Sequence, residues 1–410
     1  MMRSELRTSR PLTGAATSLR SPSFSAGGPW FAPRITRIGR PVPEAGKEGS
    51  PSGRAMNIFD AMKEHGHEEI VFWYDKETGL RAIVAIHDTS LGPALGGCRM
   101  WPYAEEAEAV TDALRLSRGM TFKNSAMGLD MGGGKAVLWA DGESDKSEAL
   151  FRSFGRLVQS LGGRYITAED VGVTAEDMSV VARETRYVGG LAENSGDPSP
   201  VTARGVYEGI CAALEAVDGK GTVDGRHVAV QGLGHVGSGL VELLVQAGAT
   251  VLATDIHEAA GRRAASRLGA RWVEPDAIYD VPCDVFAPCA LGAILNDSTI
   301  PRLQCKVVAG SANNQLAEER HGEMLRQRGI LYAPDFVING GGVVNVADAF
   351  HPDGYHPERA LARVRAIGDQ LRDIFQIANR NGISPSEAAN QLALKRLDLI
   401  GRIRRTYIPE

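Results

Sequence analysis

The sequence predicts an α/β protein with two domains and a group of helices at its C-terminal end. Short β-branched runs alternate with segments of helical periodicity over most of the chain. A glycine-rich turn joins a strand to a helix in the second half, and a glycine-rich segment with two lysines lies in the first half. A chain of 410 residues is long enough for two or three domains, each with its own core.

Residues 1–55 differ in composition from the rest of the chain. They are rich in Arg, Ser, Pro and Gly, poor in acidic residues and without strand or helix periodicity, which predicts disorder. The composition resembles an organelle transit peptide. The alternative is a translation start placed too far upstream, because Met56 directly precedes the first periodic segment. We favour the second interpretation and exclude 1–55 from the fold.

Composition excludes several classes of protein. A net charge of −5 gives no indication of nucleic-acid binding, and no apolar run is long enough to span a membrane. The cysteines are scattered and form no C-x-x-C pair, which argues against a zinc site or a disulfide framework. We therefore expect no metal and reduced, structural thiols. The five cysteines are Cys98, Cys211, Cys283, Cys289 and Cys305.

The first domain, predicted over 56–190, begins with a short helix and a β-hairpin. A glycine-rich loop at 91–97 is a tight turn or a place where a ligand carboxylate reaches backbone N–H groups. A turn-rich stretch at 189–200 marks the domain boundary. The other predicted elements are helices at 57–65, 110–117, 150–161 and from 174, and strands at 70–74, 80–86, 135–140 and 164–167.

The stretch 119–135 contains Lys123 and Lys135, with three glycines directly before the second lysine. Consecutive glycines let another molecule approach the backbone closely. Desolvation and a neighbouring cation both lower a lysine pKa, and a neutral lysine is a general base. Asp170 follows the strand 164–167 and is either the partner of such a lysine or a helix cap. The alternative for each lysine is an ordinary surface position.

A dinucleotide-binding unit opens the second domain, predicted over 191–375. Strand 226–231 leads into Gly232, Gly234 and Gly237 as G-x-G-x-x-G, followed by a helix and a strand that ends at Asp255. Glycines allow the tight turn and the approach of a pyrophosphate, and the carboxylate accepts hydrogen bonds from the ribose. This predicts a Rossmann-type domain that binds NAD. Arg262 and Arg263 could favour NADP, but we expect both on the next helix, pointing away.

Further strand–turn units follow, at 284–290, 306–309 and 330–333. Asn313 and Asn314 come after the second of these strands, where amides can hold a nicotinamide or a substrate, or simply form a turn. Pro357 is predicted to start one long helix, and a capping box at 384–387 starts another. These last helices, from about residue 375 to 410, are expected to complete the first domain.

Seven motifs, spread over 56–410, resemble the glutamate/leucine/phenylalanine/valine dehydrogenase family of amino acid dehydrogenases. The chain departs from the usual family pattern at Cys98, Gly340 and Ala349, and Gly340 bears on substrate preference. The motifs are LGPALGGCRMW (91–101), GMTFKN (119–124), GGGK (132–135), TAEDVG (167–172), GDPSPVTA (196–203), GSANNQ (310–315) and VINGGG (337–342).

The resemblance implies a role for each site residue. Lys123 would bind the substrate carboxylate with the backbone near Gly96, and Lys135 would be the general base, paired with Asp170. Thr202 and Asn313 would position the nicotinamide, and Asn314 the substrate. The side-chain pocket would be lined by Leu95, Met120, Ala168, Val343 and Val346.

The expected activity is reversible, NAD-dependent oxidative deamination of leucine and other branched-chain L-amino acids. Phenylalanine or valine as the main substrate is an alternative that depends on pocket volume. A non-catalytic NAD-binding sensor is an alternative of another class, but it would not need a buried base. The resemblance further implies a cytoplasmic homo-oligomer, an octamer, whose only other partner is the small-molecule substrate.

Overall fold

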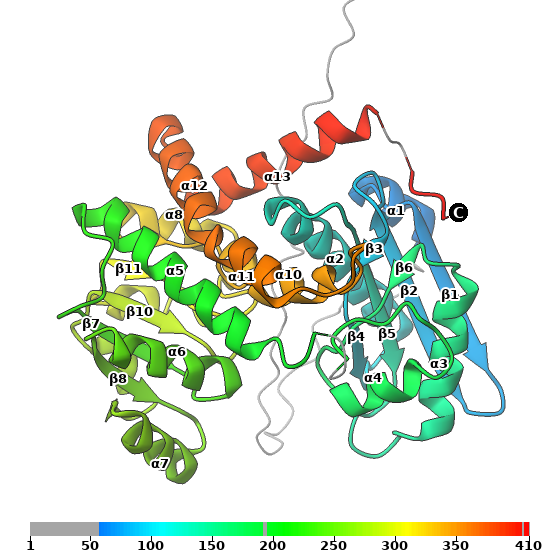
Figure 1. The fold of residues 1–410 in the computed structure, drawn as a ribbon, viewed down its shortest axis with the longest axis horizontal. Helices are drawn as coiled ribbons and strands as arrows, with labels where there is room; N and C mark the ends of the chain where they lie inside the picture. Colours follow the sequence, from blue (N-terminus) through cyan, green and yellow to red (C-terminus); the bar gives the residue numbers. More distant parts are fainter. Residues whose placement is uncertain (1–56, 192–194, 404–405, 410) are drawn as a thin grey trace, which may run out of the picture. The chain divides into compact units, whose positions relative to one another are not determined.

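A computed structural model describes residues 57–191, 195–403 and 406–409. The interpretations of residues 1–55 therefore lie outside the described residues. Within the described ranges, no helix is both long and apolar enough to cross a membrane. The α/β fold class with two sheets is confirmed (Figure 1).

The first sheet has the order β1-β2-β5-β3-β6, and β4 also pairs with β5. Its hairpin strands β1 and β2 pair antiparallel, as predicted, and β2 pairs antiparallel with β5, whereas β3, β4 and β6 run parallel to their neighbours. The strands are β1 Glu69–Asp75, β2 Leu80–Asp88, β3 Ala94–Leu95, β4 Cys98–Trp101, β5 Gly132–Trp139 and β6 Tyr165–Ile166. The helices are α1 Ile58–His65, α2 Glu106–Ala126, α3 Glu148–Ser160 and α4 Ala175–Val181.

Alternation along β2 divides the core of this sheet into two layers. Ile83 and Ala85 pack in one cluster with residues of α2, whereas Val84 and Ile86 pack in another with residues of α3 and α4. Successive side chains of a strand point to opposite faces, so a strand with both faces buried needs apolar residues at almost every position. The nearly continuous apolar run at 82–86 is the sequence signature of this arrangement.

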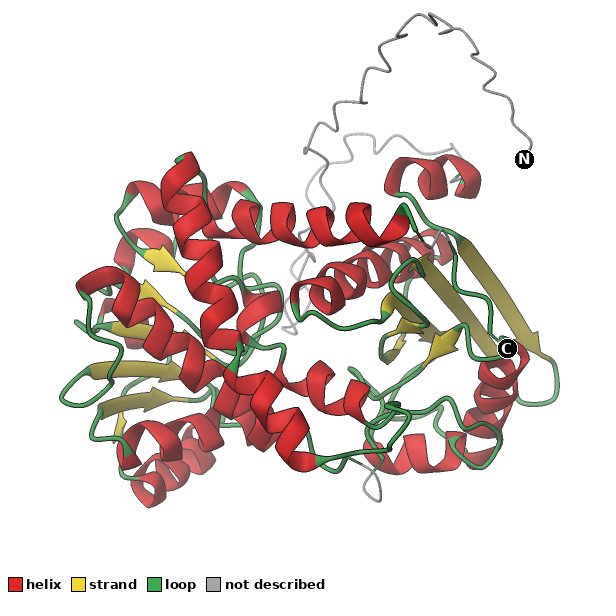
Figure 2. Cartoon of the chain, turned by 45° about the horizontal axis from the view of Figure 1, so that its top comes forward, coloured by secondary structure: helices red, strands yellow, loops and turns green. Residues whose placement is uncertain are grey.

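The second sheet is parallel throughout, with the order β12-β11-β10-β7-β8-β9. This is the strand order of a doubly wound dinucleotide-binding domain, and helices cover both of its faces (Figure 2). The strands are β7 His227–Gln231, β8 Thr250–Thr254, β9 Arg271–Trp272, β10 Val285–Pro288, β11 Val307–Val308 and β12 Leu331–Tyr332. The helices are α5 Ser199–Asp218, α6 His235–Gln246, α7 Glu258–Leu268, α8 Arg320–Gln327, and the 3₁₀ turns Ala277–Asp280 and Ile300–Arg302.

Two predictions for the remaining helices were wrong in detail. The single long helix expected from Pro357 is two helices. The backbone at Ala366 has a ψ of −9° instead of about −42°, which interrupts the α-helical geometry. The sequence also predicts a helix from Val201 with Val206, Ile210 and Val217 on one buried face, but Val217 is 40% exposed because it lies in the last turn of α5. The helices of this part are α9 Asp335–Ile338, α10 Gly341–Asp348, α11 Pro357–Arg365, α12 Ile367–Asn381 and α13 Pro385–Gly401.

The last helix, α13, contacts the first part of the chain. Ser125 of α2 donates its hydroxyl hydrogen bond to the carbonyl of Ala393 at 2.8 Å, and Arg396 donates to the carbonyl of Leu129 at 2.7 Å. These bonds support the expectation that C-terminal helices complete the first domain. The exact domain boundaries stay a prediction.

Candidate active site

Lys135 lies in β5 and forms an ion pair with Asp170, which follows β6. Lys135 Nζ is 2.8 Å from Asp170 Oδ2, and Arg99 Nε approaches the same oxygen at 3.1 Å. Strand β4 supplies Arg99 and pairs with β5, so the sheet brings both cations to one carboxylate. The lysine is 4% exposed, which excludes the ordinary surface position considered for it.

The electrostatics of this triad follow from burial and charge. Burial lowers the pKa of Lys135 from its usual value, and the negative charge of Asp170 only partly offsets that effect. Burial alone would raise the pKa of Asp170, but Lys135 and Arg99 hold it well below its usual range. Asp170 is therefore an ionised partner of Lys135, not an exposed helix cap.

Arg99 is held in turn by a second carboxylate. Asp112 of α2 accepts from Arg99 Nη1 at 2.9 Å, from the Tyr103 hydroxyl at 2.5 Å and pairs with Arg115 at 2.6 Å. Sequence reasoning missed Arg99 and Asp112. A signal was present, since Arg99 stands between the buried Cys98 and Met100 in a strand. A charged residue at such a position needs a nearby partner.

The other lysine of this stretch, Lys123, projects from α2 to a different set of groups. Its Nζ donates to Asn339 Oδ1 at 2.7 Å, and Asn339 Nδ2 donates to Asn313 Oδ1 at 2.7 Å and to the Ser311 carbonyl at 3.1 Å. Burial lowers the pKa of Lys123 to about 8, with Asp335 opposing the shift. A buried cation next to a neutral amide has an uncompensated charge, which favours an anionic ligand.

Asn339 and Asp335 were also missed by sequence reasoning. Burial raises the pKa of Asp335, although its carboxylate accepts the N–H groups of Gln315 and Phe336. Both residues follow β12, so their place after the carboxyl end of a parallel strand was the available signal. Asn314 lies in the turn after β11 with φ of 51°, and its carbonyl accepts the N–H of Ala293 at 2.7 Å, as turn chemistry predicts.

The three glycines before Lys135 do not leave room for another molecule, contrary to expectation. A Cβ on Gly133 would lie 2.1 Å from the backbone nitrogen of Thr121, and one on Gly132 would lie 2.1 Å from the carbonyl oxygen of Asp88. A Cβ on Gly134 would lie 2.7 Å from the ring of Tyr165. The chain itself fills this space, which lets α2 and its lysine pack directly on β5.

The loop 91–97 does not present the Gly96 N–H to a ligand either. That N–H donates to the Ile166 carbonyl at 3.1 Å, as part of the pairing of β3 with β6. Gly96 is required for packing, because a Cβ there would lie 1.8 Å from the Gly134 carbonyl oxygen. The expected backbone contact of Gly96 with a carboxylate therefore has no free donor.

Four of the predicted pocket residues pack in or against the same large apolar cluster. Leu95 and Val346 belong to one apolar cluster, and Ala168 and Val343 pack against it from half-buried positions. Met120 is close to Gly96, where a Cβ would lie 3.1 Å from its Cγ. Gly340, one of the departures from the family pattern, faces Met127, since a Cβ there would lie 2.0 Å from the methionine sulfur.

The glycine turn after β7 has the geometry that a pyrophosphate needs. Gly232 has φ of 101°, in the left-handed region, and a Cβ on Gly237 would lie 2.0 Å from the Gly232 carbonyl oxygen. At Gly234, which caps α6, a Cβ would meet nothing within 4 Å. Two glycines thus shape the turn, and the third opens the helix N-terminus to a ligand.

Asp255 lies beside this turn, whereas Thr202 lies next to Gly342, where an added Cβ would be 3.0 Å from the Thr202 hydroxyl oxygen. Asp255 Oδ2 accepts the N–H of Leu233 at 2.8 Å, which ties the end of β8 to the glycine loop. Arg262 is on α7, as predicted, and is engaged by Glu258 and Glu274. Thr202, in α5, donates its hydroxyl to the Pro198 carbonyl at 2.9 Å.

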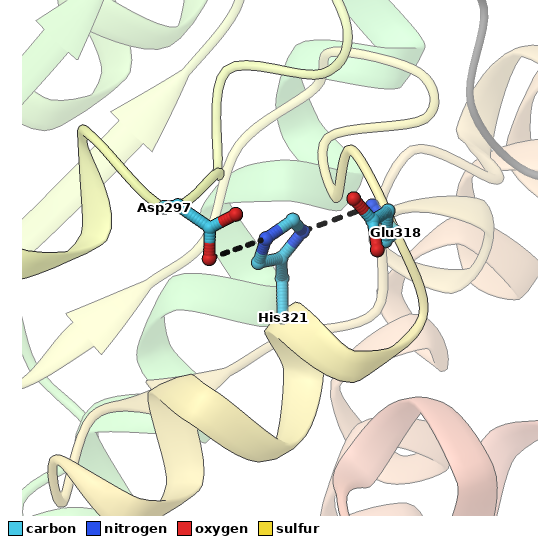
Figure 3. Close-up of side chains that lie close together, drawn as sticks. All are labelled: Asp297, Glu318 and His321. Carbon is cyan, nitrogen blue, oxygen red and sulfur yellow. Dashed lines mark hydrogen bonds and ion pairs between the residues drawn. The ribbon is translucent and has the colours of Figure 1, made fainter.

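One group of possible metal ligands occurs among the described residues, formed by Asp297, Glu318 and His321 (Figure 3). His321 Nδ1 accepts the N–H of Glu318 at 2.9 Å, so Nε2 carries the proton and faces Asp297. Arg320 pairs with both carboxylates, at 2.5 and 2.8 Å. These contacts use the candidate ligand atoms within the chain, at the start of α8.

Comparison with known proteins gives consistent matches. Residues 67–187 match the family model "Glu/Leu/Phe/Val dehydrogenase, dimerisation domain", and 195–262 and 254–399 match "Glutamate/Leucine/Phenylalanine/Valine dehydrogenase". A leucine dehydrogenase of Thermoactinomyces intermedius is 55% identical over 358 residues, 87% of this chain and 97% of that protein. One of Bacillus cereus is 51% identical over 356 residues, 86% and 97% of the two chains. The crystal structure of L-tryptophan dehydrogenase from Nostoc punctiforme has a TM-score of 0.75 at 44% identity, covering 84% of this chain and 100% of that one.

Proposed function

Since the chain belongs to the glutamate/leucine/phenylalanine/valine dehydrogenase family, whose members are pyridine-nucleotide-dependent amino acid dehydrogenases, we propose that it oxidises L-leucine with NAD. Valine and isoleucine are secondary substrates in this proposal. The products are the 2-oxo acid and ammonia, and the reaction is reversible. Family membership excludes the non-catalytic sensor. The observation that carries the proposed chemistry is the buried Lys135–Asp170 pair, 2.8 Å apart.

In the proposed mechanism Lys123 binds the substrate carboxylate. Its half-buried ammonium donates to the neutral amide of Asn339 at 2.7 Å, whereas Lys135 is paired with the carboxylate of Asp170, so Lys123 is the lysine whose charge is free to attract an anion. Asn339 also links Lys123 to Asn313, the residue proposed to position the nicotinamide. One amide therefore couples substrate binding to the orientation of the cofactor. Its part in both contacts makes Asn339 a further residue of the proposed site.

NAD⁺, held at the glycine turn around Gly234, would accept a hydride from Cα of the substrate's neutral amine form, and this would leave a protonated imine. Neutral Lys135 takes a proton from water as the water oxygen bonds to the imine carbon. The resulting Lys135 ammonium returns this proton to the substrate nitrogen. Neutral Lys135 then takes the proton of the carbinolamine hydroxyl as the C=O bond forms and the C–N bond breaks, which releases ammonia and the 2-oxo acid. Asp170 stays ionised and stabilises the ammonium form of Lys135 between these transfers.

The choice of substrate in this proposal rests on the apolar cluster around Leu95 and Val346. An apolar pocket distinguishes side chains that differ by one methylene only about 10–200-fold, so several branched-chain amino acids should react. Gly340 bears on substrate size only indirectly, because its neighbour is Met127. Phenylalanine as a main substrate stays the alternative. A relative 43% identical over 359 residues is a phenylalanine dehydrogenase.

NAD is the proposed cofactor because the turn around Gly234 is open and Asp255 lies at the end of β8. A carboxylate there accepts hydrogen bonds from ribose hydroxyls and repels a 2′-phosphate. Asp255 Oδ1 accepts the N–H of His257 at 2.9 Å and so keeps its position. Arg262, the nearest candidate to favour NADP, is occupied by two glutamates.

The base assignment is tested with Lys135→Ala. We expect kcat to fall at least about 10²–10⁴-fold with each amino acid, the usual contribution of a general base. Binding of NADH, followed by its fluorescence, should be unchanged. The control is Lys76→Ala, at a lysine with 82% of its side chain exposed. Near-normal turnover of the Lys135 variant would mean that another group is the base.

The substrate and cofactor are tested by following NADH formation at alkaline pH with L-leucine, L-valine and L-phenylalanine in parallel, and again with NADP. Leucine fastest, with NAD only, is the expected result. Phenylalanine fastest would reject the pocket assignment, and equal rates with NADP would reject the role of Asp255.

A cytoplasmic homo-octamer is the last part of this proposal. Strand β1 is the edge of its sheet, with Phe72 46% and Tyr74 69% exposed, which supports an interface there. All five cysteines lie in the described ranges and are free, as in a reducing compartment. Light scattering coupled to size-exclusion chromatography measures the mass, and a monomer would contradict this part.

A further inference from the structure

Two cysteines that are far apart in the sequence meet at one edge of the second sheet. Cys283 precedes β10 and Cys305 precedes β11, and these parallel strands pair with Val285 opposite Val307. The N–H of Cys283 donates to the Gln304 carbonyl at 3.3 Å, which places Cys283 opposite Cys305. Both side chains therefore lie on the same face of the sheet, and each thiol changes the pKa of the other.

The backbone geometry suits a covalent bond between them. Neighbouring strands lie about 4.8 Å apart, which is inside the range of about 4.4–6.8 Å between Cα atoms that disulfides adopt. Both cysteines are half-buried, and Pro282, Gln304 and Lys306 beside them are exposed. A small oxidant can therefore reach the sulfurs without unfolding of the sheet.

The two thiols differ in reactivity. Interaction with Cys283, the backbone N–H groups of Phe286 and Cys305 and the charge of Arg328 lower the pKa of the Cys305 thiol against the effect of burial. Interaction with Cys305, burial and the charge of Asp284 raise the pKa of the Cys283 thiol. Cys305 is thus the better nucleophile, and Cys283 is placed to attack the oxidised sulfur of Cys305.

We propose that Cys283 and Cys305 are a redox-sensitive pair, which a hydroperoxide converts into a disulfide that links β10 to β11. The Cys305 thiolate attacks one oxygen of the hydroperoxide, the O–O bond breaks, and a sulfenic acid forms while the leaving oxygen takes up a proton. Cys283 Sγ then bonds to the sulfenic sulfur, the S–O bond breaks, and water leaves with the Cys283 proton. The two thiols together lose two electrons and two hydrogens, and the hydroperoxide is reduced.

The position of the pair separates it from the proposed active site. Both cysteines lie before the amino ends of parallel strands, whereas Gly232 follows the carboxyl end of β7 in the same parallel sheet. Those ends are opposite edges of the sheet. The disulfide would hold the strands together without occupying the cofactor turn.

The test uses the full-length reduced protein treated with hydrogen peroxide, alkylated under denaturing conditions and digested without reduction. We expect mass spectrometry to find a peptide in which Cys283 is joined to Cys305, while Cys98, Cys211 and Cys289 are alkylated. Recovery of Cys283 and Cys305 as alkylated peptides, or as separate sulfinic acids, would overturn the proposal.

Variants identify the attacking sulfur. In Cys283→Ser, a sulfenic-acid probe such as dimedone should label Cys305, whereas in Cys305→Ser it should not label Cys283. The reverse labelling would overturn the assignment of Cys305 as the nucleophile. Cys211→Ser is the matched control, because Cys211 is also half-buried but lies on α5, and the cross-linked peptide should form in it as in the unaltered protein.

Discussion

Gly132, Gly133 and Gly134 lie inside a strand, whereas Gly232, Gly234 and Gly237 lie in a turn after a strand. In the first group the chain's own atoms occupy the position of every missing side chain, at 2.1 to 2.7 Å from an added Cβ. In the second group one position, at Gly234, is open. A dense run of glycines therefore does not by itself indicate a ligand. A glycine indicates a ligand site when it lies at the carboxyl end of a parallel strand, next to a helix N-terminus.

The sharpest test of this comparison is Gly133→Ala. The added Cβ would collide with the backbone of Thr121, which cannot rotate away, so α2 must separate from β5. We expect a loss of about 3 kcal/mol or more in the free energy of unfolding, measured with urea.

Gly119→Ala is the matched control for that variant. Gly119 lies inside α2, and an added Cβ there would meet nothing within 4 Å. A gain of about 0.5–1 kcal/mol is expected from the better helix propensity of alanine. Equal effects of the two substitutions would contradict the view that Gly133 serves packing.

Acid should destabilise the packing of α2, the helix that lies against the glycines at 132–134. His67 bonds to Ser117 at 3.0 Å and His87 to Thr121 at 2.9 Å, both on α2. Burial lowers the pKa of His67 to about 3 and that of His87 to about 4. The charges of the neighbouring His65 and Arg118 lower both pKa values further. Both histidines are neutral in the fold but ionise near pH 6.5 when unfolded.

The sign of this effect follows from those values. The neutral histidines stabilise the fold above pH 6.5, and that contribution is lost as the pH falls toward 4. We expect a decrease of roughly 2 kcal/mol per histidine between pH 7 and pH 5 in the free energy of urea unfolding. His87→Gln should flatten this dependence, and a substitution at the exposed His257 should not. An unchanged slope in His87→Gln would reject the effect.

At the open turn, Gly234→Ala should separate binding from stability. Nothing lies within 4 Å of the added Cβ, so the free energy of unfolding should change little. The methyl group would occupy the space proposed for the pyrophosphate, and we expect the Kd for NADH to rise about tenfold, which corresponds to 1.4 kcal/mol. Calorimetric titration measures it. An unchanged Kd together with lower stability would mean that Gly234 serves the fold, like Gly133.

The smallest predicted effect concerns the lysine triad. After burial and Asp170, the charge of Arg99 is the next influence on the pKa of Lys135, and it lowers that pKa. Arg99→Gln should therefore move the rise of kcat/KM to higher pH, whereas Arg99→Lys, which keeps the charge, should move it less. If kcat/KM is lower at every pH but still rises over the same pH range, Arg99 only positions Asp170.

Local patterns made most of the elements predictable. The hairpin at 69–88, the alternation in β2 and the strand–turn–helix at 227–246 are each decided by neighbours in the sequence. The capping box before α4 is likewise formed by Thr174 and Asp177, three residues apart. Lys123 and Lys135 could be chosen from sequence because a lysine among small apolar residues is unusual.

The sequence by itself determined the strand and helix pattern, the glycine turn and the identity of the two lysines, since these depend on residues close along the chain. Only the tertiary structure decided that Arg99 links Asp112 to Asp170, that Lys123 donates to Asn339, and that Cys283 lies opposite Cys305. Asn339 is 216 residues from Lys123. Such contacts depend on which strands become neighbours, and burial then fixes the charges that must be paired.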